Sequence, residues 1–380
     1  MDNRRCFFCL VIAVFMILAV DLQAGDLGPG HDNLRLNNLQ YIGTHNSYHV
    51  APGQGMAILM NAAKYSSNKE WTSDRLNVAL DYTHPSITTQ LRLGIRQFEL
   101  DVYADPEGGR FSNPGALRMM QSMPWNLPIS FNPDGDLDLP GFKVLHNPEY
   151  DFFSTSYLLV KILREIETWS AKHPEHYPII IHIEVKEGDG KALTEAYEPA
   201  VVDDFERSTW LALEDEICSV IPREKIVEPD SVRGDYASLR EAITQRGWPK
   251  LKELRGKVIF LLLNKKDTTH KFMQAFEHSL EHRLFFASLK PDHPWASWFR
   301  VPDPNYKYIS QIIEQGFLVT SMADKHTYHA RANNTEMRDK AFEVGAHFIL
   351  TDFPIPDRRF SDYQVIFENN AYIRKNPLTH

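Results

Sequence analysis

The sequence predicts an α/β fold, a single (β/α)8 barrel, regular or irregular, with a long insertion after the second strand. Apolar runs of strand length alternate with amphipathic runs of helix length along the chain, which favours parallel strands joined by helices. Several of these strands are apolar almost throughout, as strands covered on both faces are. No glycine-rich phosphate loop follows any of them, which disfavours the competing doubly wound open sheet.

The expected strands are separated by helices and loops whose patterns can be read individually. The clearest helix is 157–172, where Leu159, Ile162, Leu163, Ile166 and Trp169 recur at helical spacing. A second helix is expected at 336–344, and the long insertion is expected at 104–141. The eight predicted strands are 40–43, 96–103, 143–146, 177–185, 257–263, 283–288, 317–321 and 346–351.

The N-terminus reads as a targeting segment. Two arginines, Arg4 and Arg5, precede the apolar run 6–20, and small residues before Gly25 offer a cleavage site. A membrane anchor is the alternative, but the run is shorter than the roughly 20 residues that a span requires. We expect residues 1–24 to be a signal peptide, residues 25–380 to be the catalytic barrel, and the protein to be secreted into an extracellular or periplasmic space. Cleavage would leave Cys218 as the one remaining cysteine, so no internal disulfide is expected.

The charge balance limits the possible partners. The chain has a formal net charge of −9, with 43% apolar and 24% charged residues. Such a chain is not attracted to nucleic acid or to anionic lipid over long distances. We therefore expect no nucleic-acid partner and a monomer, and any phosphate group must be met by a local cluster of cations or by a metal.

Carboxylates and an amide stand at the ends of three predicted strands. Glu99 and Asp101 are two residues apart, so both side chains project to one face. Asn46 adds a neutral oxygen after the first strand, and Glu184 adds a carboxylate near the end of the fourth. A site of oxygen ligands alone suits Ca²⁺ or Mg²⁺ better than zinc. The alternative is that Glu99 and Asp101 form an exposed edge or a salt-bridged pair.

Two histidines accompany the carboxylates. His45 and His146 each end a strand and are each followed by asparagine. A single histidine in such a place is usually a hydrogen-bonding residue, but two beside a metal site are typical of an acid–base pair. Lys186 follows the fourth strand and either contacts substrate phosphate or pairs with a metal-binding carboxylate.

Three further histidines receive lesser roles. His49 and His84 are expected to be structural. His182 shares a strand face with Glu184, so we expect it to support the metal ligands from behind.

Several motifs together resemble one enzyme family. Segments 44–48, 94–101, 143–146, 169–174, 183–186 and 254–258 resemble the secreted calcium-dependent phosphoinositide-specific phospholipases C, and the resemblance runs from about 39 to about 352. It implies a TIM-type barrel, a catalytic Ca²⁺, brief contact with a membrane surface, and cleavage of an inositol phospholipid into diacylglycerol and inositol phosphate. One departure stands out. The resemblance leads us to expect arginines at the end of the seventh strand, where this chain has Thr-Ser-Met-Ala-Asp at 320–324.

The resemblance also implies a division of labour. The inositol 2-hydroxyl attacks the neighbouring phosphate, a carboxylate such as Glu99 takes its proton, His146 protonates the diacylglycerol oxygen and His45 stabilises the phosphorane. Two other readings stay open at this point. One is a glycerophosphodiester phosphodiesterase acting on soluble substrates, and the other is a catalytically inactive secreted binding protein.

A cluster of large apolar residues in the insertion suggests how a chain of charge −9 could meet a membrane. Flexible methionines and an indole are well suited to a lipid interface. The alternative is that the same residues pack the insertion onto the barrel. The cluster consists of Met119, Met120, Met123, Trp125 and Leu127.

Overall fold

A computed structural model of the chain describes residues 31–63, 72–122, 131–188, 197–264 and 266–379. Its centre is a ring of eight parallel strands, and every residue of most of these strands is buried. The strands are β1 (Leu39–Thr44), β2 (Gln97–Tyr103), β4 (Ile179–Val185), β5 (Val258–Leu262), β6 (Phe285–Ala287), β7 (Trp298–Arg300), β8 (Leu318–Met322) and β9 (Phe348–Thr351). The predicted (β/α)8 barrel is confirmed.

The ring is closed by pairings of unequal strength. The strands follow the order β6-β5-β4-β2-β1-β9-β8-β7. The two ends of this path meet through one bridge between Ser288 and Trp298. Strands β1 and β2 also share one register pair, Thr44 with Phe98, whereas β2 and β4 are paired from Gln97 with Ile180 to Val102 with Val185. Strand pairing is therefore extensive between β2 and β4, the strands that carry the carboxylates.

One predicted barrel strand is wrong and another was missed. Residues 143–146 yield only β3 (Lys143–Val144), which pairs antiparallel with Val102 and Tyr103 outside the ring. The eighth barrel strand is β7, which has three residues and was not predicted. A short strand β10 (Ile373–Lys375) pairs antiparallel with the start of β1 and was not predicted either.

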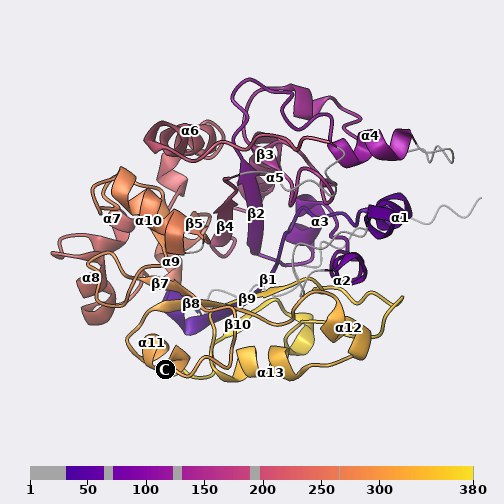
Figure 1. The fold of residues 1–380 in the computed structure, drawn as a ribbon. Helices are drawn as coiled ribbons and strands as arrows, with labels where there is room; N and C mark the ends of the chain where they lie inside the picture. Colours follow the sequence, from indigo (N-terminus) through magenta and orange to yellow (C-terminus); the bar gives the residue numbers. More distant parts are fainter. Residues whose placement is uncertain (1–30, 64–71, 123–130, 189–196, 265, 380) are drawn as a thin grey trace, which may run out of the picture.

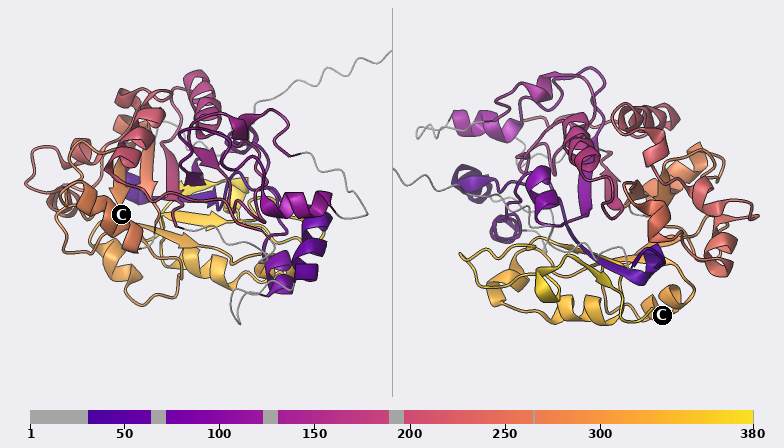
Figure 2. Two further views of the ribbon diagram at one scale, coloured as in Figure 1. Left: turned by 45° about the horizontal axis from the view of Figure 1, so that its top comes forward. Right: turned by 180° about the vertical axis from the view of Figure 1, so that it is seen from behind.

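Helices surround most of the ring (Figures 1 and 2). The predicted helix 157–172 is α5 (Leu159–Lys172), which buries the expected apolar stripe but begins at Leu159. The predicted helix 336–344 is α13 (Glu336–Glu343). The other helices of this layer are α3 (Ile87–Arg92), α6 (Arg207–Cys218), α7 (Pro229–Arg233), α8 (Leu239–Gln245), α9 (Leu251–Leu254), α10 (Lys266–Ala275), α11 (Ile309–Glu314) and α12 (Tyr328–Ala332).

Three helices beside the barrel form a second, smaller apolar cluster. They are α1 (Gly53–Ala63), α2 (Ser73–Ala79) and α4 (Gly115–Gln121), on the right of Figure 1. Met120 is 5% exposed within this cluster, and Met119 packs against it. These two methionines therefore pack the insertion, and the prediction that Met120 enters a membrane is wrong. Met123, Trp125 and Leu127 lie outside the described residues.

Other predictions about the chain as a whole have mixed outcomes. Cys218 is a free thiol, as expected. Across the described ranges, no helix combines the length and the apolar character that crossing a bilayer requires. The predicted signal peptide 1–24 lies outside the described residues and stays a prediction.

Candidate active site

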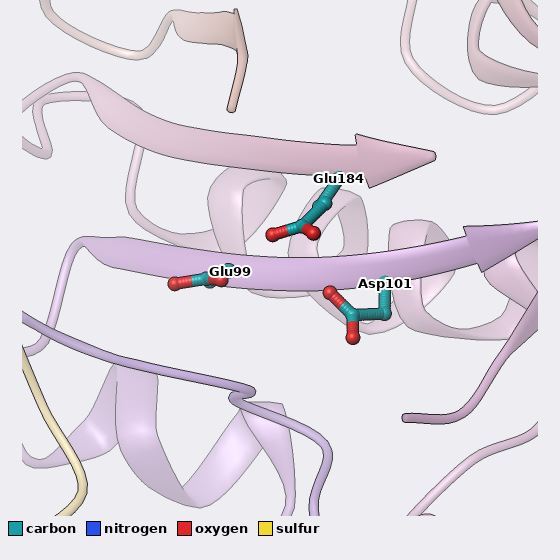
Figure 3. Close-up of side chains that lie close together, drawn as sticks. All are labelled: Glu99, Asp101 and Glu184. Carbon is teal, nitrogen blue, oxygen red and sulfur yellow. The ribbon is translucent and has the colours of Figure 1, made fainter. Parts of the chain in front are cut away.

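Three carboxylates meet at one end of the barrel. Glu99 and Asp101 come from the same face of β2, and Glu184 comes from β4, where it lies in register with Asp101. Figure 3 shows the three side chains on these two neighbouring strands. One oxygen of each lies within 4.8 Å of the others. The strand period of two and the parallel register thus bring together the ligands that the sequence predicts.

Burial makes this cluster costly without a cation. Glu99 and Asp101 are 2% and 1% exposed. Glu99 Oε2 and Asp101 Oδ1 are buried and have no hydrogen-bond partner in the described part of the chain. Burial, opposed by His45 and reinforced by Asp101 and Glu184, raises the pKa of Glu99 to about 7. Unsatisfied buried carboxylate oxygens of this kind fit a hard divalent cation such as Ca²⁺.

Lys186 is the cation that the chain itself places at the cluster. Its Nζ lies 2.7 Å from Asp101 Oδ2 and 3.1 Å from Glu184 Oε1. Of the two roles left open by the sequence, the structure shows a pairing with two carboxylates of the cluster, and contact with substrate phosphate stays a prediction. Although burial lowers it, these two carboxylates raise the pKa of Lys186 well above its usual value.

Asn46 sits in the turn that follows β1, with a left-handed φ of 46°, a conformation that asparagine tolerates. The Ser47 N–H donates to the Glu99 carbonyl, and Ser47 Oγ accepts from the Glu99 N–H. These bonds fix the turn beside β2. Asn46 Nδ2 donates to the Tyr82 hydroxyl at 3.1 Å, and Oδ1 accepts from the Tyr48 hydroxyl at 3.4 Å. The amide oxygen keeps a lone pair, so the predicted role as a cation ligand fits this placement.

His45 lies between the carboxylate cluster and an aspartate. Its Nε2 is 4.0 Å from Glu99 Oε1, and its Nδ1 is 2.8 Å from Asp352 Oδ1. Asp352 directly follows β9, and its N–H donates to Asp324 Oδ1. Burial lowers the pKa of His45, but the negative charges of Glu99 and Asp352 outweigh this effect and raise the pKa to about 10. The Asp352 contact fixes the orientation of the ring and leaves Nε2 toward Glu99.

His146 is backed by an aspartate in the same manner. Its Nδ1 lies 2.6 Å from Asp151 Oδ2, and its side chain is 31% exposed. Asp151 in turn lies 2.9 and 3.0 Å from Nε2 of the buried His49, whose Nδ1 lies 3.0 Å from the Tyr82 carbonyl. Both ring nitrogens of His49 thus lie within hydrogen-bond distance of an oxygen, which fixes the ring beside Asp151. Burial raises the pKa of Asp151, but the two histidines hold it at about 2.

The sequence analysis assigned no role to Asp352 or Asp151, and it gave His49 only a structural one. Asp352 had a usable signal, because it stands at the end of a barrel strand like the other site residues. Asp151 had none, since it lies in the loop after His146. His49 was expected to be structural and does not contact the carboxylate cluster, but it positions Asp151.

The structure also tests the expectations for two other histidines, His84 and His182. His84 Nε2 lies 2.9 Å from the His45 carbonyl, so it supports the turn after β1. His182 Nε2 lies 2.9 Å from Thr320 Oγ1 inside the barrel. Burial lowers the pKa of His182 to about 3. The expectation that His182 supports the metal ligands is wrong.

A cavity of about 430 Å³ opens beside His45 and Glu99. Its wall combines the cationic residues Arg300 and Lys325 with apolar side chains. Arg300 belongs to β7, the strand that the sequence reading missed. Positive charge is therefore present on this side of the barrel, although 320–324 lacks the expected arginines. The apolar part of the wall is formed by Leu263, Met322, Met337 and Leu350.

Replacing Asp151 by Asn is expected to lower kcat by about 10- to 100-fold, because the histidine it orients would lose its fixed tautomer and position. Ca²⁺ affinity should stay unchanged. The measurement is steady-state turnover of phosphatidylinositol together with calorimetric Ca²⁺ titration. Asp105→Asn is the matched control, since Asp105 is also buried but lies 3.4 Å from Lys143 Nζ. An equal loss of kcat in both variants would remove the positioning role of Asp151.

A barrel that holds an acidic cation site between two aspartate-backed histidines is the arrangement of a metal-dependent phosphodiesterase. Residues 34–377 match the family model described as phosphoinositide phospholipase C, Ca²⁺-dependent. The chain belongs to this family, and it is a phospholipase C with Ca²⁺ as its cofactor and inositol phospholipid as its substrate class. No curated protein sequence matches it.

Solved structures share the fold. One is the calcium-dependent phosphoinositol-specific phospholipase C of a Pseudomonas species in complex with myoinositol, with 14% identity, a TM-score of 0.53, and coverage of 93% of this chain and 98% of that one. A second crystal form of the same bacterial enzyme, without myoinositol, gives 15% identity, a TM-score of 0.52 and the same coverage. The likeness therefore extends over nearly the whole of both chains.

Proposed function

We propose that this phospholipase C cleaves phosphatidylinositol-type lipids by internal attack, releasing diacylglycerol and a cyclic inositol phosphate, which water can then open. The observation that carries the proposal is the pair of histidines, each fixed through Nδ1 by an aspartate at 2.8 or 2.6 Å, beside a buried three-carboxylate cluster. Internal attack needs one group to accept a proton, one to donate a proton and a source of positive charge. These residues supply all three.

The residues take distinct parts in the reaction. The inositol 2-hydroxyl forms a bond to phosphorus as its proton passes to a carboxylate, for which Glu99 is the candidate because one oxygen has no hydrogen-bond partner in the described structure. The bond from phosphorus to the glycerol oxygen breaks, and His146 delivers the proton that this oxygen needs. His45, held by Asp352, donates a hydrogen bond to the phosphorane oxygens.

The carboxylates of Glu99, Asp101 and Glu184, with the amide oxygen of Asn46, would hold Ca²⁺. When held by these residues, the ion would lower the pKa of the attacking hydroxyl and offset negative charge at phosphorus. Burial raises the pKa of both Asp101 and Glu184, and Lys186 opposes this effect at each of them; the pKa of Glu184 is lowered on balance, whereas that of Asp101 stays raised. The cavity beside His45 is the place for the inositol ring, with Arg300 and Lys325 near its phosphate.

Phosphorus NMR of the products tests the proposal. Phosphatidylinositol incubated with the enzyme and Ca²⁺ should give the resonance of a five-membered cyclic phosphodiester, and excess chelator should abolish it. Parallel incubation with glycerophosphoinositol separates the phospholipase from the soluble-substrate phosphodiesterase. Turnover of glycerophosphoinositol alone would support the latter, and binding of lipid without any turnover would support an inactive barrel.

We also propose that the enzyme docks briefly on membranes through its catalytic end. Tyr328 and Ile355 follow β8 and β9, the strands next to the site, and are each 42% exposed. Tyr328→Ser with Ile355→Ser should lower hydrolysis of vesicle lipid about tenfold, since burying two such side chains contributes roughly 25 cal/mol per Å². Hydrolysis of a short-chain soluble substrate should not change.

The control for this double variant is Leu378→Ser. Leu378 is 53% exposed and follows β10, which pairs with the start of β1 at the other end of the barrel. Vesicle hydrolysis should be unaffected by this change. Equal losses of the double variant on vesicles and on soluble substrate would show that the two residues support the fold and not docking.

Secretion and a monomeric state belong to the same proposal. The apolar run that follows Arg4 and Arg5 supports export, with a mature N-terminus at Gly25. Mass spectrometry of the exported protein checks the cleavage position. Sedimentation at micromolar concentration checks the monomer.

A further inference from the structure

A basic pocket lies at the end of the barrel opposite the catalytic site. It has a volume of about 370 Å³ and shares no lining residue with the catalytic cavity. Lys257 directly precedes β5, and Arg35 precedes β1, whereas the catalytic residues follow their strands or stand near their ends. Because the strands are parallel, the pocket opens at the end where they begin. Helices α7, α8 and α9 lie on this side of the barrel (Figure 1).

The pocket is dominated by positive charge. Arg35, Arg246, Lys250 and Lys257 line it, with Glu253 as its one carboxylate. In the described structure, no carboxylate lies within ion-pair distance of any of these four cations. This local excess is notable in a chain of net charge −9.

Acidic residues close to the pocket are engaged elsewhere. Glu228 pairs with Arg223 at 2.6 Å, and Asp230 pairs with Arg233 at 2.8 Å. Asp32 pairs with Arg255 at 2.8 Å. Glu253 Oε2 accepts from the Lys250 N–H at 3.1 Å. The four lining cations therefore have no carboxylate counterion of their own.

Backbone contacts hold the pocket in shape. The Leu36 N–H donates to the Pro249 carbonyl, and the Leu251 N–H donates to the Leu34 carbonyl, which brings Arg35 and Lys250 side by side. Arg35 Nη1 also donates to the Trp248 carbonyl at 2.5 Å.

The second arginine is anchored in a similar way. Arg246 Nη2 donates to the Val232 carbonyl. A Cβ at Gly234, which has a φ of +57°, would lie 3.2 Å from Arg246 Nη1. Each of the two guanidinium groups is thus held in place by one N–H that donates to a backbone carbonyl. The other N–H groups of Arg35 and Arg246 can donate to a ligand.

We infer that this pocket binds a small molecule carrying two phosphate monoester groups. Each such group carries a charge of about −1.5 to −2 at neutral pH, so two of them carry about −3 to −4 and balance the net charge of four cations and Glu253. Arginine matches phosphate oxygens through paired N–H groups, and lysine adds a mobile point charge. The volume is at the lower end of ligand pockets, which suits a single sugar or polyol ring. Both a soluble sugar bisphosphate and a phosphorylated lipid headgroup have this chemistry.

Calorimetry in chelator tests the inference on the full-length enzyme, because without Ca²⁺ there is neither turnover nor Ca²⁺–phosphate association. The soluble probe is fructose 1,6-bisphosphate, which is no inositol and so does not mimic the catalytic substrate. We expect saturable 1:1 binding that weakens with added salt, and much weaker binding of fructose 6-phosphate. Sedimentation in the same chelator with vesicles of phosphatidylcholine and phosphatidylinositol 4,5-bisphosphate, whose headgroup carries two phosphate monoesters, tests the lipid source, and the pocket variants separate it from binding at the catalytic site.

Variants with opposite expected effects make the test specific. Lys250→Gln with Lys257→Gln should weaken fructose 1,6-bisphosphate binding at least about tenfold, through loss of charged hydrogen bonds. Glu253→Gln should strengthen binding, which misfolding cannot produce. The matched control is Lys252→Gln with Lys172→Gln, two exposed lysines outside the pocket. Turnover of phosphatidylinositol by the double variants should equal that of the wild type.

Several results would overturn the inference. One is the absence of saturable binding of fructose 1,6-bisphosphate. Another is equal weakening by the pocket and control double variants, which would indicate general attraction to surface charge. Unchanged or weaker binding by Glu253→Gln would place the ligand elsewhere.

Discussion

Asp101→Asn is expected to lower turnover of phosphatidylinositol about 1000-fold. Stabilisation of developing charge by a bound cation is worth several kcal/mol, and each step of about 1.4 kcal/mol changes the rate tenfold. Asp101 is 1% exposed, faces Glu184 across two paired strands and contacts Lys186 at 2.7 Å. The substitution removes charge but little volume, so the fold should persist. Calorimetric Ca²⁺ titration should show weaker binding in parallel.

The matched control is Glu214→Gln. Glu214 is also a buried carboxylate, 5% exposed, and it contacts Arg283 Nη1 at 2.6 Å far from the strand ends that carry the site. This variant should lose thermal stability while keeping kcat and Ca²⁺ affinity. Wild-type turnover in excess chelator, or full activity of Asp101→Asn, would contradict the assignment of the cation site.

His146→Ala is expected to reduce cleavage of phosphatidylinositol by about 100- to 10,000-fold, the range for loss of a positioned general acid. The effect should depend on the leaving group. A nitrophenyl ester of inositol phosphate releases a stable anion that needs no proton, so its cleavage should fall far less. The measurement is kcat/KM on both substrates at one Ca²⁺ concentration.

The control for this variant is His282→Ala, a histidine with an 82% exposed side chain outside the site. It should leave both substrates unaffected. Equal losses of His146→Ala on the lipid and on the nitrophenyl ester would remove His146 from the role of general acid. Loss of Ca²⁺ binding would instead point to a structural role.

Much of the site could be predicted because it depends on strand ends. Glu99 and Asp101 interrupt an apolar run at alternate positions, and His45 follows another such run, so their shared location follows from the parallel barrel. Asp151 could not be predicted, since a loop residue has no periodic signal. The period of two correctly assigned His182 to the face of Glu184. It does not tell how deep on that face a residue lies, and His182 contacts Thr320 inside the barrel.

The fold was predicted better than its individual strands. Strand β7 has three residues, Trp298–Arg300, between prolines at 294 and 302, too few for a recognisable pattern. Residues 143–146 have the composition of a strand, but only Lys143 and Val144 form one, and it pairs antiparallel to β2. The predicted number of barrel strands, eight, was therefore correct, although one of the predicted strands was not part of the barrel. Arg300 was overlooked together with β7, and with it part of the positive wall of the catalytic cavity.

The contacts of Lys186 affect how tightly a divalent ion can bind at the carboxylate cluster, because the lysine is already paired with two of the carboxylates. Its ammonium group already neutralises part of the charge of Asp101 and Glu184, at 2.7 and 3.1 Å, so these two carboxylates have a counterion within the chain itself. A divalent ion that binds there must compete with the Lys186 ammonium group for Asp101 and Glu184. Its measured affinity is therefore reduced by the attraction between Lys186 and these two carboxylates. Turnover is therefore expected to require a higher Ca²⁺ concentration than a cluster of three carboxylates without a neighbouring lysine would require.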